Sequence, residues 1–378
     1  NGTAANNGRV SVTVARNGDL ISDMYIEMVS SATLVQVTGG ADDAMFCAER
    51  AIQDVELSIG GQRIDKHYQR WWRLYSELYL DESKKATWGK MTTPGDLAAG
   101  AIYLPLIFFF NRNPGLALPL IALQYHEVRL DFDLSSEFSS YTDGTTFKVW
   151  GNYVYLDTEE RRRFAQKGHE YLIEQLQHTG TDTLAAASGT KQIRLSYNHP
   201  VKELVWCFSN VATNGNSMWN FTSESCDNDV KLHTGLAGIT ASNSYVSLST
   251  YGSPMLGTGT EMGGTAIFTE DAIGPLSSFK LILNGQDRFK EQAGKYFNQV
   301  QPYYHHTGCP YPGIYSYSFA LKPEEHQPTG TCNFSRIDNA QVQVVANTLN
   351  NATSLHMFAT NYNVLRIQSG MGGLAFSN

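Results

Sequence analysis

The chain has 378 residues, which suits two domains of roughly 100–200 residues better than one large core. Its net charge of −8 argues against direct binding of nucleic acid, because phosphate contacts require clustered Lys and Arg. Charged residues make up 17% of the chain, below the roughly 25% of typical soluble domains. We therefore expect much of the surface to be neutral and polar, or covered by neighbouring molecules.

Apolar residues recur mainly at every second position, which is typical of half-buried strands. In chain order, the clearest examples are Val10–Val14, Val55–Ile59, Val128–Phe132, Ile193–Tyr197 and Val342–Val344. Turn-forming pairs interrupt these runs, among them Asn17-Gly18, Gly60-Gly61, Pro114-Gly115, Asn284-Gly285 and Pro312-Gly313. The pattern predicts an all-β fold with few helices.

Two short helices are predicted against this background. Residues Lys66–Leu80, dense in aromatic side chains and Arg, form the first and weaker candidate. The second spans Asp157–Lys167, because acidic residues at the start and basic residues at the end of a helix interact favourably with its dipole. The longest apolar run, Ile102–Phe110, is too short to cross a bilayer, and no signal segment opens the chain. We expect a soluble product. Because the chain begins at Asn1 without a Met, we also expect that an N-terminal segment has been removed or left out.

A weak internal repeat is the most informative feature of the chain. Asn17 and Asn198 stand in similar turns ahead of strands, 181 positions apart. The segment Ile59–Lys66 resembles Leu283–Lys290, and Asn152–Leu156 resembles Asn361–Leu365. Three matches in the same order, at similar spacings, predict a duplicated domain.

The spacings also predict domain boundaries. Residues 1–178 form the first domain, 179–190 a linker of small polar residues, and 191–378 the second domain. The second copy contains about forty extra residues, which we assign to a long surface loop around 209–274, rich in Asn, Ser, Thr and Gly.

Several long segments resemble the major capsid proteins of large icosahedral nucleocytoplasmic DNA viruses, of the phycodnavirus and chlorovirus type. They run from near the first residue to the last and are therefore more specific than a short motif. They are Arg16–Ile21, Asp54–Tyr68, Pro105–Val128, Phe164–Gln166, His169–Gln177, Cys332–Asn339 and Tyr362–Asn378.

The resemblance implies two tandem eight-stranded antiparallel jelly rolls, with a few short helices and long surface loops. It implies a homotrimer that forms a pseudo-hexagonal capsomer and tiles an icosahedral shell. Neighbouring capsomers, minor capsid proteins and, through outer loops, the host cell surface are the implied partners. The internal viral membrane would lie beneath the shell without being spanned, and assembly would take place in the host cytoplasm. Packed sheets with few free edges agree with the strand pattern.

No residue pattern predicts an enzyme. His305, His306, Cys309 and Cys332 have the ligand types of a zinc site, but no second closely spaced pair accompanies them, so a surface loop is favoured. We predict no catalytic residue, cofactor or metal. Arg161–Arg163 is expected to be a solvated helix end that pairs with acidic groups, and Gly370–Gly373 a close-packed turn at an interface. The five cysteines are few and scattered, which favours reduced thiols.

Glycosylation is the one modification that we predict. The resemblance implies sugars on outer loops, attached outside the usual acceptor motif, and loop position or that motif selects Asn210, Asn214, Asn216, Asn220, Asn243 and Asn351. A jelly-roll carbohydrate-binding protein is the alternative function, and a cupin-like metal enzyme a third. A native mass separates the first two, because a lectin can be monomeric.

Overall fold

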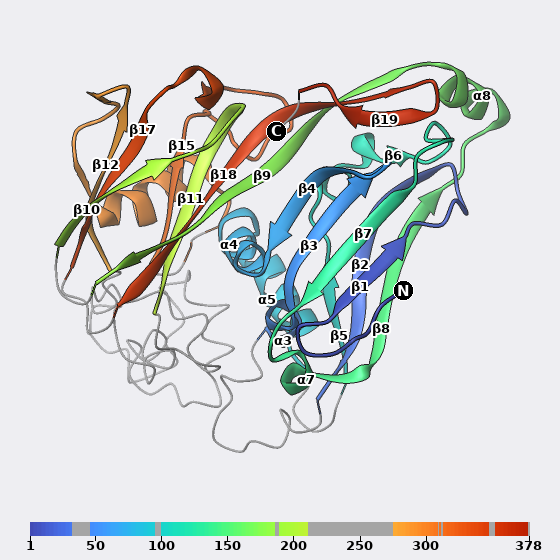
Figure 1. The fold of residues 1–378 in the computed structure, drawn as a ribbon, viewed down its shortest axis with the longest axis horizontal. Coiled ribbons are helices and arrows are strands. Elements are labelled where there is room, and N and C mark those ends of the chain that lie inside the picture. Colours follow the sequence, from blue (N-terminus) through green and yellow to red (C-terminus); the bar gives the residue numbers. More distant parts are fainter. Residues whose placement is uncertain are drawn as a thin grey trace.

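Antiparallel sheets make up most of the chain and stack as two sandwiches that lie side by side along the long axis of the molecule (Figure 1). The computed structural model describes residues 1–31, 46–94, 100–185, 189–210, 275–308, 310, 313–347 and 352–376. The predicted all-β class is confirmed.

The first sandwich contains two sheets of four strands each. Sheet A has the order β1-β7-β3-β4, and in sheet B the strand β2 pairs with β5, β6 and β8. The strands are β1 (Arg9–Thr13), β2 (Leu20–Ser30), β3 (Ile52–Ile59), β4 (Gln62–Tyr68), β5 (Ala101–Pro105), β6 (Leu118–Pro119), β7 (Val128–Leu134) and β8 (Thr142–Val154).

The second sandwich is built from sheets C and D. In sheet C the strand β11 pairs with β15, β16 and β18, and β18 also pairs with β9 and β19. Sheet D has the order β10-β17-β12-β13, with β14 beside β12. The strands are β9 (His169–Leu184), β10 (Gly189–Leu195), β11 (Pro200–Asn210), β12 (Leu276–Leu283), β13 (Gln286–Asp287), β14 (Gln292–Ala293), β15 (Ile314–Ser318), β16 (Cys332–Asn333), β17 (Ala340–Ala346), β18 (Thr353–Gln368) and β19 (Met371–Leu374).

The two sandwiches share one pattern of strand pairing. In sheet A, β7 lies between β1 and β3, as β17 lies between β10 and β12 in sheet D. In sheet B, β2 pairs with β5, β6 and β8, as β11 pairs with β15, β16 and β18 in sheet C. Sheet A therefore corresponds to sheet D, and sheet B to sheet C. The fold is a double jelly roll, and the predicted duplication is confirmed.

Three strands of the second half, β9, β14 and β19, have no counterpart in the first. β9 runs to Leu184 and pairs with β18, so residues 179–184 lie in a strand where composition predicted a linker. Residues 169–178, assigned from sequence to the first domain, belong to sheet C. Composition predicted a linker here because a polar, Thr-rich sequence is compatible with an exposed edge strand as well as with a linker. The remaining boundaries stay a prediction.

The helices are short and lie mostly in the first half. Both predicted helices are present: α4 (Gln69–Tyr79) and α8 (Thr158–Gln166). α5 was not predicted; its N-cap Asp81 accepts a hydrogen bond from the backbone N–H of Lys84. The other helical segments are α3 (Cys47–Ala51), α5 (Glu82–Thr92), α6 (Phe109–Arg112), η1 (Pro114–Leu116), α7 (Phe138–Tyr141), η5 (Tyr296–Val300), α11 (Gln301–His305) and η6 (Phe334–Arg336).

Each sandwich buries its own core through strand alternation. In β2 the buried residues Met24, Ile26 and Met28 face inward while their neighbours face outward. In the second core the Trp206 ring stacks on Phe279 with 4.4 Å between ring centroids. Burying one such side chain contributes roughly 1.5–3 kcal/mol, which is why period-two patterning is enough to specify these sheets.

The predicted insertion falls between β11 and β12. β11 ends at Asn210 and β12 begins at Leu276, whereas β2 and the equivalent β3 are separated only by residues 31–51. Residues 209–210 of the predicted loop belong to β11, and 211–274 lie outside the described residues.

Candidate functional site at the seam and on the outer sheet faces

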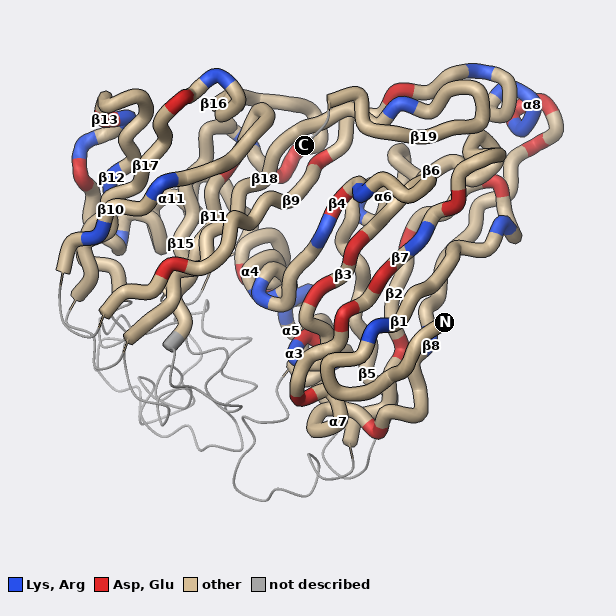
Figure 2. Tube along the Cα trace, viewed as in Figure 1, with Lys and Arg blue, Asp and Glu red and all other residues tan. Residues whose placement is uncertain are grey.

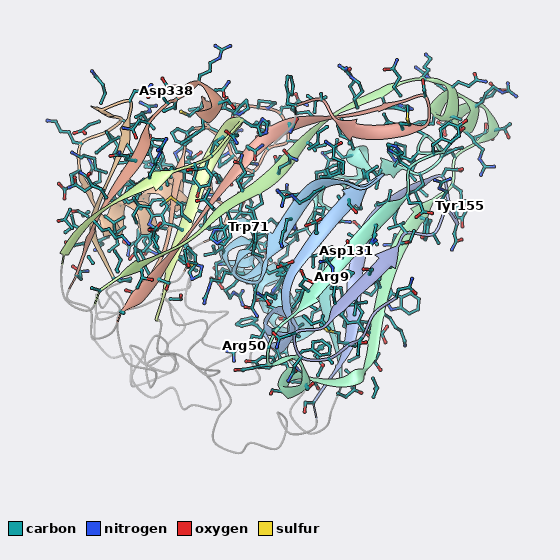
Figure 3. All side chains as sticks on the ribbon, in the orientation of Figure 1. Arg9, Arg50, Trp71, Asp131, Tyr155 and Asp338 are labelled. Carbon is teal, nitrogen blue, oxygen red and sulfur yellow. The ribbon has the colours of Figure 1, made fainter. Side chains whose placement is uncertain are left out.

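The seam between the two halves is filled by α4, which covers the outer face of sheet C. On β11, Trp206 faces the second core, whereas Val205 and Cys207 belong to the core of the first half. The Trp71 ring of α4 lies 5.8 Å from that of Phe358 on β18. Figure 3 labels Trp71, on the helix between the two sandwiches. Sheet C is therefore buried on both faces.

Polar contacts fix the register of β9 against β4. The Gln175 side chain donates a hydrogen bond to the Ile64 carbonyl. The backbone N–H of Leu176 donates to Asp65 Oδ1 at 3.0 Å, and Asp65 Oδ2 lies 3.1 Å from His67 Nε2. These side chains are buried, so loss of one partner would leave an unsatisfied group.

A buried charge cluster lies beside these contacts. The Glu174 carboxylate on β9 lies 2.6 Å from Arg112 Nη2 and 2.7 Å from Lys202 Nζ. Lys202 Nζ also donates a hydrogen bond to the Pro323 carbonyl at 2.6 Å. Burial tends to raise the pKa of Glu174, but the two cations outweigh it and the pKa is lowered. Burial lowers the pKa of Lys202 to about 8, against the opposing pull of Glu174. The cluster joins α6, β9 and β11.

His306 forms a second buried contact between charged groups. Its Nε2 lies 3.2 Å from Glu203 Oε2 and its Nδ1 3.3 Å from Glu324 Oε1. Burial alone would lower the pKa of His306, but the two carboxylates raise it to about 9. The imidazolium therefore links β11 to the loop after β15 at neutral pH. This geometry differs from the zinc-like set noted in the sequence, of which Cys309 lies outside the described residues.

The β18–β19 hairpin docks onto the first half, as Figure 1 shows above β6. The Tyr125 N–H donates to the Gly370 carbonyl at 3.0 Å, and the Gly372 N–H to His126 Nδ1 at 3.1 Å. A Cβ on Gly372 would come within 2.6 Å of Leu123. The prediction of a close-packed turn at an interface is confirmed for Gly370–Gly373, and the interface is the one between the halves.

The outer face of sheet B, in contrast, carries partly exposed aromatic side chains in the part of the chain that the structure describes. Tyr25, Tyr103 and Trp150 lie on it as neighbours, since Tyr25 pairs with Trp150 across β2 and β8 and its ring lies 5.9 Å from Tyr103. We call these three residues the aromatic face. Trp150 is 47% exposed, and its Nε1 donates to Glu27 at 2.6 Å. A cavity of about 440 Å³ opens beside them, lined by Asp23, Met24, Tyr25, Met91, Tyr103, Pro105, Leu106 and Asn111.

The predicted surface residues have ordinary structural partners. Arg161 binds Asp19 with 2.9 Å between Nε and Oδ1, and Arg162 pairs with Glu159 within α8. The expectation that this basic run is a helix end that pairs with acidic groups is confirmed for these two residues. Figure 2 shows the blue and red segments of α8 at one end of the molecule. Lys and Arg elsewhere alternate with Asp and Glu along sheet A.

Other predicted residues lie mostly outside the described part. The Asn210 side chain is not described. Outside the described residues, in 211–274 and 348–351, lie Asn214, Asn216, Asn220, Asn243 and Asn351. Cys47, Cys207 and Cys332 are free thiols, and burial raises the pKa of Cys47 and of Cys207 to about 12. Among the described residues, no group of three or more His, Cys, Asp or Glu is arranged to hold a metal, and no helix is long and apolar enough to cross a membrane.

Sequence profiles of two capsid families match nearly the whole chain. The profile described as "Major capsid protein N-terminus" covers residues 1–157, and "Large eukaryotic DNA virus major capsid protein" covers 160–373. The chain belongs to this capsid protein family. It is a structural subunit of a virus capsid, and the expectation raised by the sequence resemblance is confirmed.

Two named relatives are similar to this chain over its full length. The major capsid protein of Paramecium bursaria Chlorella virus 1 is 43% identical, covering 100% of this chain and 90% of its own. That of Phaeocystis pouchetii virus is 38% identical, covering 100% and 91%. These relatives give no support to the carbohydrate-binding alternative.

Solved structures show the same fold. A chain in a quasi-atomic model of the PBCV-1 virus capsid superimposes with a TM-score of 0.82 at 41% identity, covering 100% of this chain and 95% of that one. The Faustovirus major capsid protein superimposes with a TM-score of 0.70 at 12% identity, covering 97% and 88%, and supports the fold alone.

Proposed function

We propose that the capsid subunit works as a homotrimer whose six jelly rolls form one tile with a nearly hexagonal outline. The observation that carries this proposal is the pattern of strand pairing that the two sandwiches in each chain share. Two similar wedges per chain, repeated by a three-fold axis, give six similar wedges around a ring. Such a ring can tile a surface with one kind of building block.

The interior of the seam supports a rigid tile. α4, β9 and the buried ion pair between Arg112 and Glu174 join the halves. A tile that keeps its shape needs such a joint, because small rotations between wedges would spoil the outline. We propose that the work of the protein is this shape, with no catalytic step.

The remaining partners belong to the same proposal. Neighbouring tiles and minor capsid proteins would bind the rim and inner side, outer loops would meet the host cell surface, and a viral membrane would lie beneath the shell. The acidic chain would make no direct contact with nucleic acid. Glycans on Asn210, Asn214, Asn216, Asn220, Asn243 and Asn351 stay a prediction, which peptide mass mapping of protein from virus particles tests.

Native mass spectrometry and electron microscopy of the purified protein test the tile. We expect a mass of three chains at micromolar concentration and three-lobed particles with a six-sided outline. A chain that stays monomeric at those concentrations, or a ring with another number of lobes, would contradict the proposal.

A further inference from the structure

The segment that fills the seam has a counterpart in the second half. In the first half, β4 is followed by α4, which covers the outer face of sheet C. In the second half, the equivalent strand β13 is followed by β14 and then by η5 and α11. The duplication thus places η5 and α11 in the chain position that α4 and α5 occupy in the first copy.

α11 carries large side chains that are exposed among the described residues. Tyr303 is 81% exposed and Tyr304 71%, whereas Trp71 on α4 is 3% exposed. Leu321, 74% exposed, lies next to them, since His305 Nδ1 is 3.0 Å from the Leu321 carbonyl oxygen. Adjacent exposed aromatic and aliphatic side chains are typical of a protein interface.

The face that α4 covers also has a counterpart. Sheet C corresponds to sheet B, so the equivalent of the covered face is the outer face of sheet B, with its aromatic face and cavity. The cavity has apolar walls from Met91, Pro105 and Leu106, and polar groups from Asp23 and Asn111. A tyrosine suits such a site, because its ring packs on the walls and its hydroxyl can donate to a carboxylate or an amide oxygen.

Within one chain the two surfaces belong to different sandwiches. Figure 2 shows α11 in the second half, and β5 and β8 of sheet B in the first half. Figure 3 likewise shows Tyr155, at the end of β8, and Asp338, beside β17, toward opposite ends of the molecule. An α11 segment that packs on the outer face of sheet B would therefore come from another copy of the chain.

We propose that Tyr303 and Tyr304 of one copy pack on the aromatic face of the next copy, as α4 packs on sheet C within each chain. The contact between copies then repeats the contact within the chain, so one kind of joint occurs six times around the ring. Such a head-to-tail contact closes when the rotation per joint is one sixth of a turn. This inference rests on the proposed trimer and names the surfaces that hold it together.

The first test replaces residues on each side of the proposed joint. We expect the double variant Tyr303→Ala/Tyr304→Ala, and separately Trp150→Ala, to raise the concentration at half-assembly by about 30-fold or more, as loss of an interface hot spot does. Tyr125→Ala is the matched control, since Tyr125 is 75% exposed but lies at the β18–β19 hairpin. Sedimentation velocity over a dilution series gives the assembly, and circular dichroism checks that each variant is folded.

The second test maps the contact without assuming how well variants fold. A photo-reactive benzoylphenylalanine placed at Tyr303 should, on irradiation of the assembled protein, join two chains, and mass spectrometry should locate the bond in β2, β5 or β8. If both variants still form the trimer as readily as the wild type, or if the cross-links fall elsewhere, this inference is overturned and the proposed tile is left intact. A wild-type chain that never trimerises would overturn the proposed tile as well.

Discussion

The outer faces of sheets B and C come from equivalent strands, yet sheet C is covered within the chain and sheet B is open. The covered face carries Val205, Cys207 and Phe358, which are apolar and buried. The open face carries Tyr25, Trp150 and Glu27, which combine aromatic area with polar atoms. A face that stays buried after folding can be purely apolar. A face that must remain soluble until assembly needs aromatic residues with polar tips.

Replacing Trp71 on the covered face should give the largest difference in stability between the two faces. We expect Trp71→Ala to lower the free energy of unfolding by about 3–5 kcal/mol, because it empties a buried site at the seam. Trp150→Ala should change it by less than about 1 kcal/mol in chains kept below the concentration of assembly. Urea unfolding of both variants measures the difference. Equal losses would mean that sheet B is as well covered as sheet C.

The charge on His306 should make the seam sensitive to alkaline pH. Its pKa of about 9 lies above the ordinary 6.5, so its contribution is fully present below about pH 6.5 and disappears as the pH rises through about 9. The shift corresponds to at most about 3 kcal/mol. The free energy of unfolding of the wild type should therefore exceed that of His306→Gln most at pH 6 and least near pH 10. Urea unfolding at several pH values measures this difference. Comparison of the two proteins cancels the opposite change expected from Lys202, whose pKa is lowered to about 8. A pH-independent difference would contradict this assignment.

A double-mutant cycle can test whether the buried charge cluster joins the halves. Glu174→Gln and Arg112→Met should each destabilise the protein, and their coupling should be about 1–3 kcal/mol, because the two groups come from opposite halves, lie 2.6 Å apart and are largely buried. Lys148 and Glu27, 3.4 Å apart on the open face of sheet B, are the matched surface pair and should couple by less than about 1 kcal/mol. Similar couplings at both sites would show that burial at the seam adds nothing.

Two glycines allow the close packing of the hairpin to be measured apart from its backbone conformation. Gly370 and Gly61 both have φ near +80°, but a Cβ on Gly370 would lie 2.6 Å from Tyr125, whereas nothing lies within 4 Å of one on Gly61. Gly61→Ala should therefore cost about 1 kcal/mol from backbone strain, and Gly370→Ala about 2 kcal/mol. Thermal unfolding measures both. If Gly61→Ala is the more destabilising, the hairpin docks less tightly than the contacts imply.

The sequence predicted the class of fold and the duplication because both depend on local signals. Strand alternation and the turn at Gly60-Gly61 leave a trace in a few consecutive residues, and the same turn recurs at Asn284-Gly285. The end of the first domain could not be located this way. Whether Thr179–Thr183 forms a strand depends on its partner β18, which lies about 180 residues away in the sequence.

The buried charges at the seam were also missed. Lys202 and Glu203 interrupt an otherwise apolar run, Val201–Phe208, and that break was the available signal. It is a weak one, because alternating polar residues in a strand usually face water. Only the arrival of Glu174 from β9 and of His306 from the α11 region gives these charges their buried partners.

Since β9 pairs with β18, sheet C cannot be completed early in synthesis. Leu176 pairs with Thr360, so its partner leaves the ribosome only after 184 more residues have been translated. Until then the Phe358 ring that Trp71 of α4 contacts is missing, and the edge of β9 that pairs with β18 is free. Long-range pairing of this kind is slow, and exposed strand edges attract other chains. We therefore expect the nascent subunit to need a chaperone while its second half is translated.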